Sequence, residues 1–169
     1  MKKFLLINIL ILCFSFSFAQ KIEKHKLNSK YVATIMCIMS NNVKDNKCER
    51  YYKKEYERFF KDVNVVTPEK MLEFLEIYFK IGHYDNHKDA IEDGACIFIE
   101  LNIDEPNYPK KYHCLLIVGY QKDGEVYIYF DPHIYSNTGL WTAPAKSFDD
   151  NNYYYYIKGI TQKSMSINY

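Results

Sequence analysis

Two residues are spaced so that they could carry out acid–base chemistry together. His113 precedes an apolar run over residues 114–120, and Asp131 follows a second run over residues 125–130. The polar segment Gln121-Lys122-Asp123-Gly124 between the runs is typical of a β-hairpin turn. Because the midpoint between His113 and Asp131 falls inside this turn, we predict that they face each other on one side of the sheet. A carboxylate there would orient the imidazole as a general base or as the partner of a thiolate. The alternative is a structural pair that closes the strand ends.

Helices are predicted to precede this hairpin. The first is apolar nearly all round, as buried helices are, and begins near Asn28 or Ser29. The third begins at Thr67-Pro68-Glu69, where a cap, a proline and an acid follow in the expected order, and its apolar spacing continues to Phe79. The four predicted helices cover residues 29–39, residues 47–61 after a cap at Asp45 or Asn46, residues from 68 onward, and residues 86–93 before Gly94.

Strands follow the helices. They are expected at residues 95–101, 114–120, 125–130 and 153–160, with a polar loop over residues 102–111. Helices first and antiparallel strands later predict an α+β fold, with N-terminal helices packed on a C-terminal antiparallel β-sheet. No repeat or linker divides the chain, so residues 20–169 are predicted to form a single domain.

The first 19 residues have the three parts of a secretory signal peptide. Lys2 and Lys3 give a positive start, residues 4–18 are mostly apolar, and Ser17-Phe18-Ala19 offers small residues for cleavage before Gln20. A retained membrane anchor is the alternative, but the run is short of the roughly 20 residues that a spanning helix needs. We therefore predict export from a bacterial cell, to the periplasm or the extracellular space, with no stable membrane span after signal removal.

Charge and composition narrow the range of partners. The chain has 22 basic and 21 acidic side chains and no basic stripe, so a nucleic-acid partner is not expected. His83 and His87 are spaced like metal ligands on a helix, but Gly82 indicates a loop, and a solvated pair is the simpler interpretation. We predict no cofactor and no metal.

Four cysteines remain after Cys13 is removed with the signal peptide. An exported protein can form disulfides, although buried free thiols are an equal alternative, and three pairings are possible. The four residues are Cys37, Cys48, Cys96 and Cys114.

A known family shares several of these motifs in the same order. The segment from Tyr112 to Tyr120, with residues 126–132 ending in Asp131-Pro132, resembles the His…Asp-Pro hairpin of papain-like cysteine peptidases. The branch it is most similar to processes double-glycine leaders of bacteriocins. Three upstream segments also resemble family motifs: Asn46-Lys47-Cys48-Glu49, Thr67-Pro68-Glu69-Lys70-Met71-Leu72 and Asp89-Ala90-Ile91-Glu92-Asp93-Gly94. The resemblance implies a papain-like fold and a peptide or protein as substrate or partner. It also implies that His113 shuttles the proton and Asp131 orients its ring.

The nucleophile departs from the family pattern. The family's cysteine lies at the amino end of the first long helix, where backbone N–H groups stabilise a thiolate. Matching Ala33 to the alanine of that motif puts Tyr31 in the cysteine position. The oxyanion glutamine would fall near His25, and the only glutamine nearby is Gln20. A phenol is a weak acyl carrier, so Tyr31 is a poor substitute.

Two cysteines are candidates to replace the missing one. Cys37 lies about two turns into the first predicted helix, and it could act only if that helix began later. Cys48 lies near the amino end of the second helix, where a structural role, such as a bridge to Cys37, is the simpler expectation. His133 and Trp141 could line the same cleft.

Two hypotheses about function follow. In the first, the protein is a secreted cysteine peptidase in which Cys37 attacks, His113 shuttles the proton and Asp131 orients the ring. In the second, it is a pseudoenzyme that serves as a peptide- or protein-binding module of the inhibitor or immunity type. A thiol within reach of His113 would favour the enzyme, and Tyr31 in that place would favour the binding module.

Overall fold

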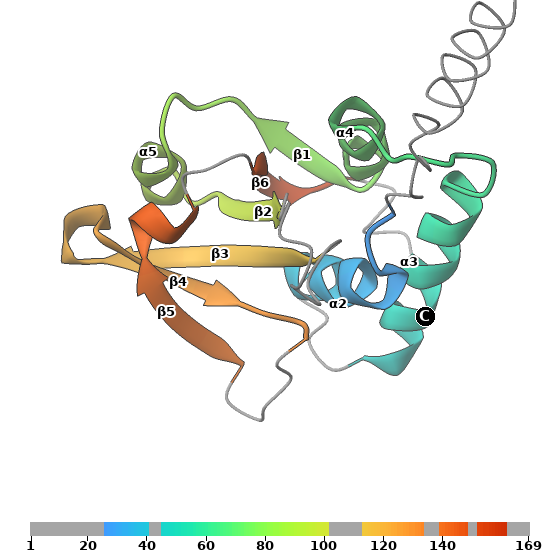
Figure 1. The fold of residues 1–169 in the computed structure, drawn as a ribbon, viewed down its shortest axis with the longest axis horizontal. Helices are drawn as coiled ribbons and strands as arrows, with labels where there is room; N and C mark the ends of the chain where they lie inside the picture. Colours follow the sequence, from blue (N-terminus) through green and yellow to red (C-terminus); the bar gives the residue numbers. More distant parts are fainter. Residues whose placement is uncertain (1–25, 41–44, 102–112, 134–138, 149–151, 162–169) are drawn as a thin grey trace, which may run out of the picture.

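The computed structural model describes five stretches of the chain, which Figure 1 shows in colour. They are residues 26–40, 45–101, 113–133, 139–148 and 152–161. The predicted signal peptide, its cleavage site and the predicted loop over residues 102–111 lie outside the described residues. None of the helices in the described stretches is long and apolar enough to cross a bilayer.

The four predicted helices are confirmed, with small shifts at their ends. They are α2 (Ser29–Met39), α3 (Asn46–Phe59), α4 (Pro68–Glu76) and α5 (His87–Glu92). Each starts at a polar side chain that accepts a hydrogen bond from a backbone N–H of the first turn, which satisfies a donor that the helix leaves free. These capping residues are Asn28, Asp45, Thr67 and Asn86.

In the described stretches six antiparallel strands form one sheet, which confirms the α+β fold class. Their order is β1-β6-β2-β3-β4-β5. The strands are β1 (Phe79–Gly82), β2 (Cys96–Glu100), β3 (Cys114–Gln121), β4 (Val126–Phe130), β5 (Leu140–Pro144) and β6 (Tyr153–Ile160). The sequence predicted four of them and missed the two edge strands, β1 and β5.

The predicted helical spacing up to Phe79 is wrong at its end. Helix α4 stops at Glu76, and Phe79 starts β1 opposite Ile160 of β6. Tyr78 and Phe79 are both buried. Two neighbouring residues can be buried in a helix or in a strand, so their apolar character did not show where the helix ends. The pairing with β6, which is remote in sequence, selects the strand.

Helices cover the two faces of the sheet unequally. The larger core lies between the sheet and helices α2, α3 and α4, and includes Phe98, Leu116 and Phe130 from the strands. The smaller core, on the other face, contains Ile97 and Ile99 and packs against α5. Phe98 alternates with Ile97 and Ile99 because successive strand residues point to opposite faces. Figure 1 shows α2 at one end of β3 and α5 toward the other.

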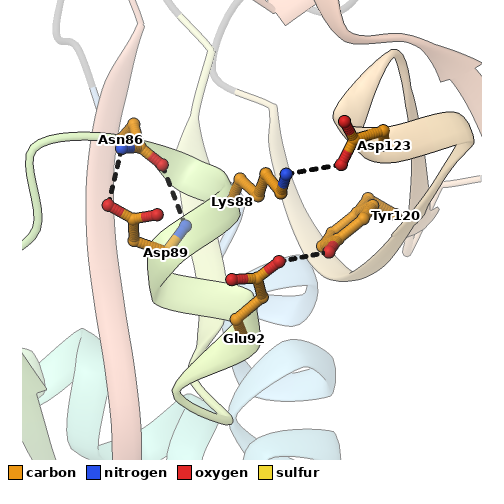
Figure 2. A network of polar contacts seen from close by, with 6 residues as sticks. All are labelled: Asn86, Lys88, Asp89, Glu92, Tyr120 and Asp123. Carbon is orange, nitrogen blue, oxygen red and sulfur yellow. Dashed lines mark hydrogen bonds and ion pairs between the residues drawn. The ribbon is translucent and has the colours of Figure 1, made fainter.

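Helix α5 is attached to the turn between β3 and β4 by two polar contacts (Figure 2). The Lys88 ammonium pairs with the Asp123 carboxylate, and the Tyr120 hydroxyl donates to Glu92 Oε1 at 2.6 Å. Exposed pairs of this kind stabilise a fold only weakly.

The register of the hairpin differs from the predicted one. Leu116 lies opposite Phe130, and a bulge shifts the pairing by one residue in the middle of β3. Continuing the register from Leu116 would place His113 opposite His133 rather than opposite Asp131. His113 and Asp131 are therefore diagonal neighbours, an offset of two residues that keeps their side chains on the same side of the sheet.

The turn between the strands causes this offset. It is a short helical turn, Lys122–Gly124, in which Lys122, Asp123 and Gly124 all have positive φ angles. Strand β3 runs one residue further than predicted, to Gln121, so the turn is centred later in the sequence than the midpoint of His113 and Asp131. A turn built from consecutive left-handed residues is hard to place from sequence when only one of them is glycine.

We predict that Asn28→Ala lowers the free energy of unfolding by about 1 kcal/mol, because the Asn28 side chain accepts the Lys30 N–H at 3.0 Å and caps α2. Urea unfolding followed by circular dichroism measures the change. Asn28→Asp keeps the acceptor and should be close to the unmodified protein. Equal stability of the alanine variant and the unmodified protein would contradict this role.

Candidate functional site

A histidine and a carboxylate meet at the ends of two adjacent strands. His113 immediately precedes β3 and Asp131 immediately follows β4, and His113 Nε2 lies 2.7 Å from Asp131 Oδ1. Each side chain is 2% exposed. The same Asp131 oxygen accepts the backbone N–H of His133 at 2.8 Å, so it fixes both the ring and the turn after β4. An ionised carboxylate can only accept hydrogen bonds, so Nε2 of His113 carries the proton in this contact. The other ring nitrogen, Nδ1, takes no part in the contact with Asp131.

Tyr31 from α2 packs against this histidine. Its ring is perpendicular to the His113 ring, with the centroids 5.3 Å apart. Its hydroxyl lies 2.5 Å from Nδ1 of His133. The His133 ring is also 5.9 Å from the His113 ring, centroid to centroid. We call Tyr31, His113 and His133 the ring cluster.

The cap on α2 explains why the Tyr31 side chain lies beside His113 and His133. The helix begins at Ser29 after the Asn28 cap, so Tyr31 lies in its first turn, at the amino end. The buried residues of α2, beginning with Val32 and Ala33, hold this helix against the sheet and α3. The helix amino end, with its free N–H groups and positive end of the dipole, thus lies beside the two histidines.

Cys37 lies elsewhere, in the core. It is 4% exposed and belongs to the larger core cluster, and its thiol is within hydrogen-bonding reach of Cys48 on α3. The Cys48 thiol and burial together raise the pKa of Cys37 well above its ordinary value. These surroundings disfavour a thiolate. The role of Cys37 as nucleophile stays a prediction.

The other cysteines of the described stretches are also free thiols. Burial raises the pKa of Cys96 to about 11 and that of Cys114 well above its ordinary value. Cys114 follows His113 in sequence, but it belongs to the larger core on the helix-facing side of the sheet. Alternation along the strand therefore turns this thiol away from the side of its neighbour.

A second carboxyl group near the site was missed by the sequence analysis. Glu100 ends β2 directly opposite Cys114, the residue after His113. Burial raises the pKa of Glu100 to about 7, and its carboxyl lies 3.2 Å from the Tyr155 hydroxyl. The available signal was one acid at the end of an otherwise apolar strand.

The remaining predicted residues have other neighbours in the described stretches. His87 packs on Tyr154, with the ring centroids 4.4 Å apart, and its Nδ1 lies 3.1 Å from the Tyr156 hydroxyl. The stretches that the structure describes contain no group of three potential metal ligands. Trp141 lies on edge strand β5, opposite Tyr129, and is 37% exposed.

Helices packed on an antiparallel sheet, with a His–Asp pair at the strand ends, define a papain-like α+β domain. A family model described as "Peptidase_C39 like family" matches residues 17–161, and the chain belongs to this family of peptidase-like proteins. Neither the curated proteins nor the solved structures gave a match.

Asp131→Ala is predicted to lower the free energy of unfolding by about 2 to 4 kcal/mol, because a buried acceptor with two donors is lost. The matched variant His133→Ala changes an exposed side chain and should cost less than about 1 kcal/mol. Urea unfolding at pH 7 measures both. Similar losses in the two variants would show that Asp131 does not hold the strand ends.

Glu100 is predicted to make stability fall as the pH rises. Between its ordinary pKa of 4.5 and about 7, the folded protein keeps a proton that the unfolded chain has released. The free energy of unfolding should therefore drop by at most about 3 kcal/mol from pH 4.5 to pH 8 through this group. Glu100→Gln removes the dependence, whereas Glu76→Gln, on the exposed side of α4, should leave it in place. Unfolding curves at several pH values measure the slope, and parallel profiles for the unmodified protein and Glu100→Gln would refute the assignment.

Proposed function

We propose that this protein is an exported pseudopeptidase: a peptidase-like domain that binds a peptide or protein without cleaving it. In this proposal His113 and Asp131 hold the family's histidine and acid positions, and Tyr31 occupies the position of the nucleophile. The observation that carries the proposal is the packing of the Tyr31 ring against His113 at the amino end of α2. Export is inferred from the signal-like residues 1–19.

The state of the thiols supports this proposal. Peptide cleavage by this chemistry needs a thiolate within reach of a histidine, at about hydrogen-bonding distance. The pKa values of Cys37, Cys96 and Cys114 are all raised, and Cys37 and Cys114 belong to the larger core. Tyr31 offers a bulky phenol in place of the nucleophile, and its hydroxyl contacts His133.

The ring cluster can still recognise a peptide. The Tyr31 hydroxyl, which already contacts His133 Nδ1, can accept a peptide N–H, and the exposed His133 ring leaves its Nε2 to bond a peptide carbonyl. The amino end of α2 favours a carbonyl or carboxylate oxygen at the same place. A cleft with these groups would bind a peptide backbone while lacking an atom to attack it.

A cysteine peptidase is the second candidate, and one observation favours it. The buried His113–Asp131 contact at 2.7 Å is the arrangement that a general base needs. In this alternative Cys37 is the nucleophile, and α2 must shift or unwind to bring its thiol to His113.

Thiol labelling distinguishes the two functions. The purified mature domain is treated at neutral pH with a limiting alkylating agent and with an epoxysuccinyl cysteine-peptidase inhibitor, and mass spectrometry locates any adduct. We expect slow labelling at every cysteine, with all free thiols recovered after unfolding. A fast adduct on Cys37 that slows in His113→Ala would instead establish the peptidase.

Tyr31→Cys is predicted to create the reactive thiol that the natural sequence lacks. A cysteine at the amino end of α2 beside His113 should be alkylated at least about tenfold faster than any native cysteine at pH 7. The rate should fall when His113→Ala is added. Tyr153→Cys, at an exposed tyrosine of β6, is the matched control for simple accessibility. Equal rates at the two introduced cysteines would show that position 31 does not correspond to the nucleophile.

A further inference from the structure

A cavity of about 300 Å³ lies beside strand β6, away from the ring cluster. Strand β1 ends at Gly82, opposite Tyr156, and among the described residues no strand pairs with the same edge of β6 from Tyr153 to Tyr155. The first turn of α4 and the segment after β1 border this space instead. The lining residues are Pro68, Glu69, Leu72, Ile81, Gly82, His83, Tyr84, Tyr154, Tyr155 and Tyr156.

Four tyrosine rings form much of the wall, and all four of their hydroxyls are already bonded. The Tyr154 hydroxyl donates to the carbonyl of Phe148. The Tyr84 hydroxyl donates to Asp93. The Tyr155 hydroxyl lies 3.3 Å from the carbonyl of Pro68, and the Tyr156 hydroxyl lies 3.1 Å from the His87 ring. With these hydroxyls in use, the four tyrosines offer a ligand mainly the surfaces of their rings.

The charge on the wall is negative. Glu69 is the only carboxylate among the lining residues, and hydrogen bonds from its own backbone N–H and from Thr67 lower its pKa, which keeps it ionised. Apart from the tyrosines, His83 is the only other titratable group among these lining residues. A cation already uses one of these rings, because Lys158 Nζ lies 5.6 Å from the centre of the Tyr84 ring while it pairs with Asp93 at 2.6 Å.

We propose that this cavity binds the arginine side chain of a peptide. The planar guanidinium can stack flat on a tyrosine ring, whereas an ammonium such as that of Lys158 contacts it only as a point charge, and the guanidinium can also pair with the Glu69 carboxylate at the rim. The edge of β6 from Tyr153 to Tyr155, with which no described strand pairs, can hydrogen-bond the backbone of the same peptide segment. This inference rests on the proposed function, because it assumes that the ligand of the domain is a peptide.

Strand β6, beside the cavity, is separated by one strand from β3, which His113 precedes. Tyr153 of β6 lies opposite Glu100 of β2, which lies opposite Cys114, the residue after His113. Two strand spacings separate β6 from β3, roughly 10 Å across the sheet. An extended peptide covers that distance in about three residues.

Nuclear magnetic resonance titration of the ¹⁵N-labelled mature domain tests this inference with two small probes. N-acetyl-arginine amide carries the cation, and N-acetyl-citrulline amide has nearly the same shape without it. We expect the arginine probe to shift the amide signals of Gly82 and Tyr154 and to bind several-fold more tightly than the citrulline probe. Glu69→Gln should weaken arginine binding about fivefold, as expected for one partly exposed ion pair and its stacking.

Two control variants show whether binding depends on Glu69 in particular and on this cavity alone. Glu73→Gln removes an exposed acid of the same helix that pairs with Lys70, and it should leave the affinity unchanged. Glu125→Gln, at an exposed acid of the turn between β3 and β4 outside the cavity, should also leave it unchanged. Equal affinity for the two probes, or shifts confined to the ring cluster, would overturn the inference. Either result would overturn the arginine site without affecting the thiol-labelling test of the proposed function. Conversely, fast labelling of Cys37 would overturn the pseudopeptidase proposal without affecting the arginine site.

Discussion

The burial of helix α2 is the constraint on which the rest of this structure depends. Val32, Ala33, Ile35 and Met36 are each fully buried, so this helix has apolar side chains on nearly every side and must be enclosed. The sheet covers it on one side and α3 on another. At roughly 25 cal/mol per Å² of apolar surface, such burial outweighs any single polar contact of the site. Where α2 begins therefore decides what lies beside His113.

The cap at Asn28 converts this packing into a functional geometry. A helix that starts at Ser29 presents the residue of its first turn, Tyr31, to the strand ends. It also carries Cys37, two turns later, into the core beside Cys48. One boundary thus fixes both facts that bear on catalysis: a phenol stands beside the histidine, and the candidate thiol lies away from it.

Two carboxyl groups near the same end of the sheet have opposite electrostatic roles. Asp131 accepts two hydrogen bonds, from His113 and from the backbone of His133, which stabilise its charge despite burial. Glu100 lies beside the Tyr155 hydroxyl, and burial raises its pKa to about 7. Burial alone favours the neutral acid, and for Glu100 it outweighs the hydrogen bond with the Tyr155 hydroxyl.

The sequence by itself determined the α+β class, the four helices with their caps, four of the six strands, and the closeness of His113 to Asp131. Capping, apolar periodicity and turn composition act over a few residues, so they can be read from a short segment. Only the tertiary structure decided the edge strands β1 and β5, the register of the hairpin, the contact between Tyr31 and His133, and the surroundings of Glu100. Each of these depends on partners remote in the chain: β1 exists through its pairing with β6, and the 2.5 Å contact of Tyr31 joins residues 102 positions apart. Local signals cannot encode such contacts, because their free energy appears only when the distant segments are packed together.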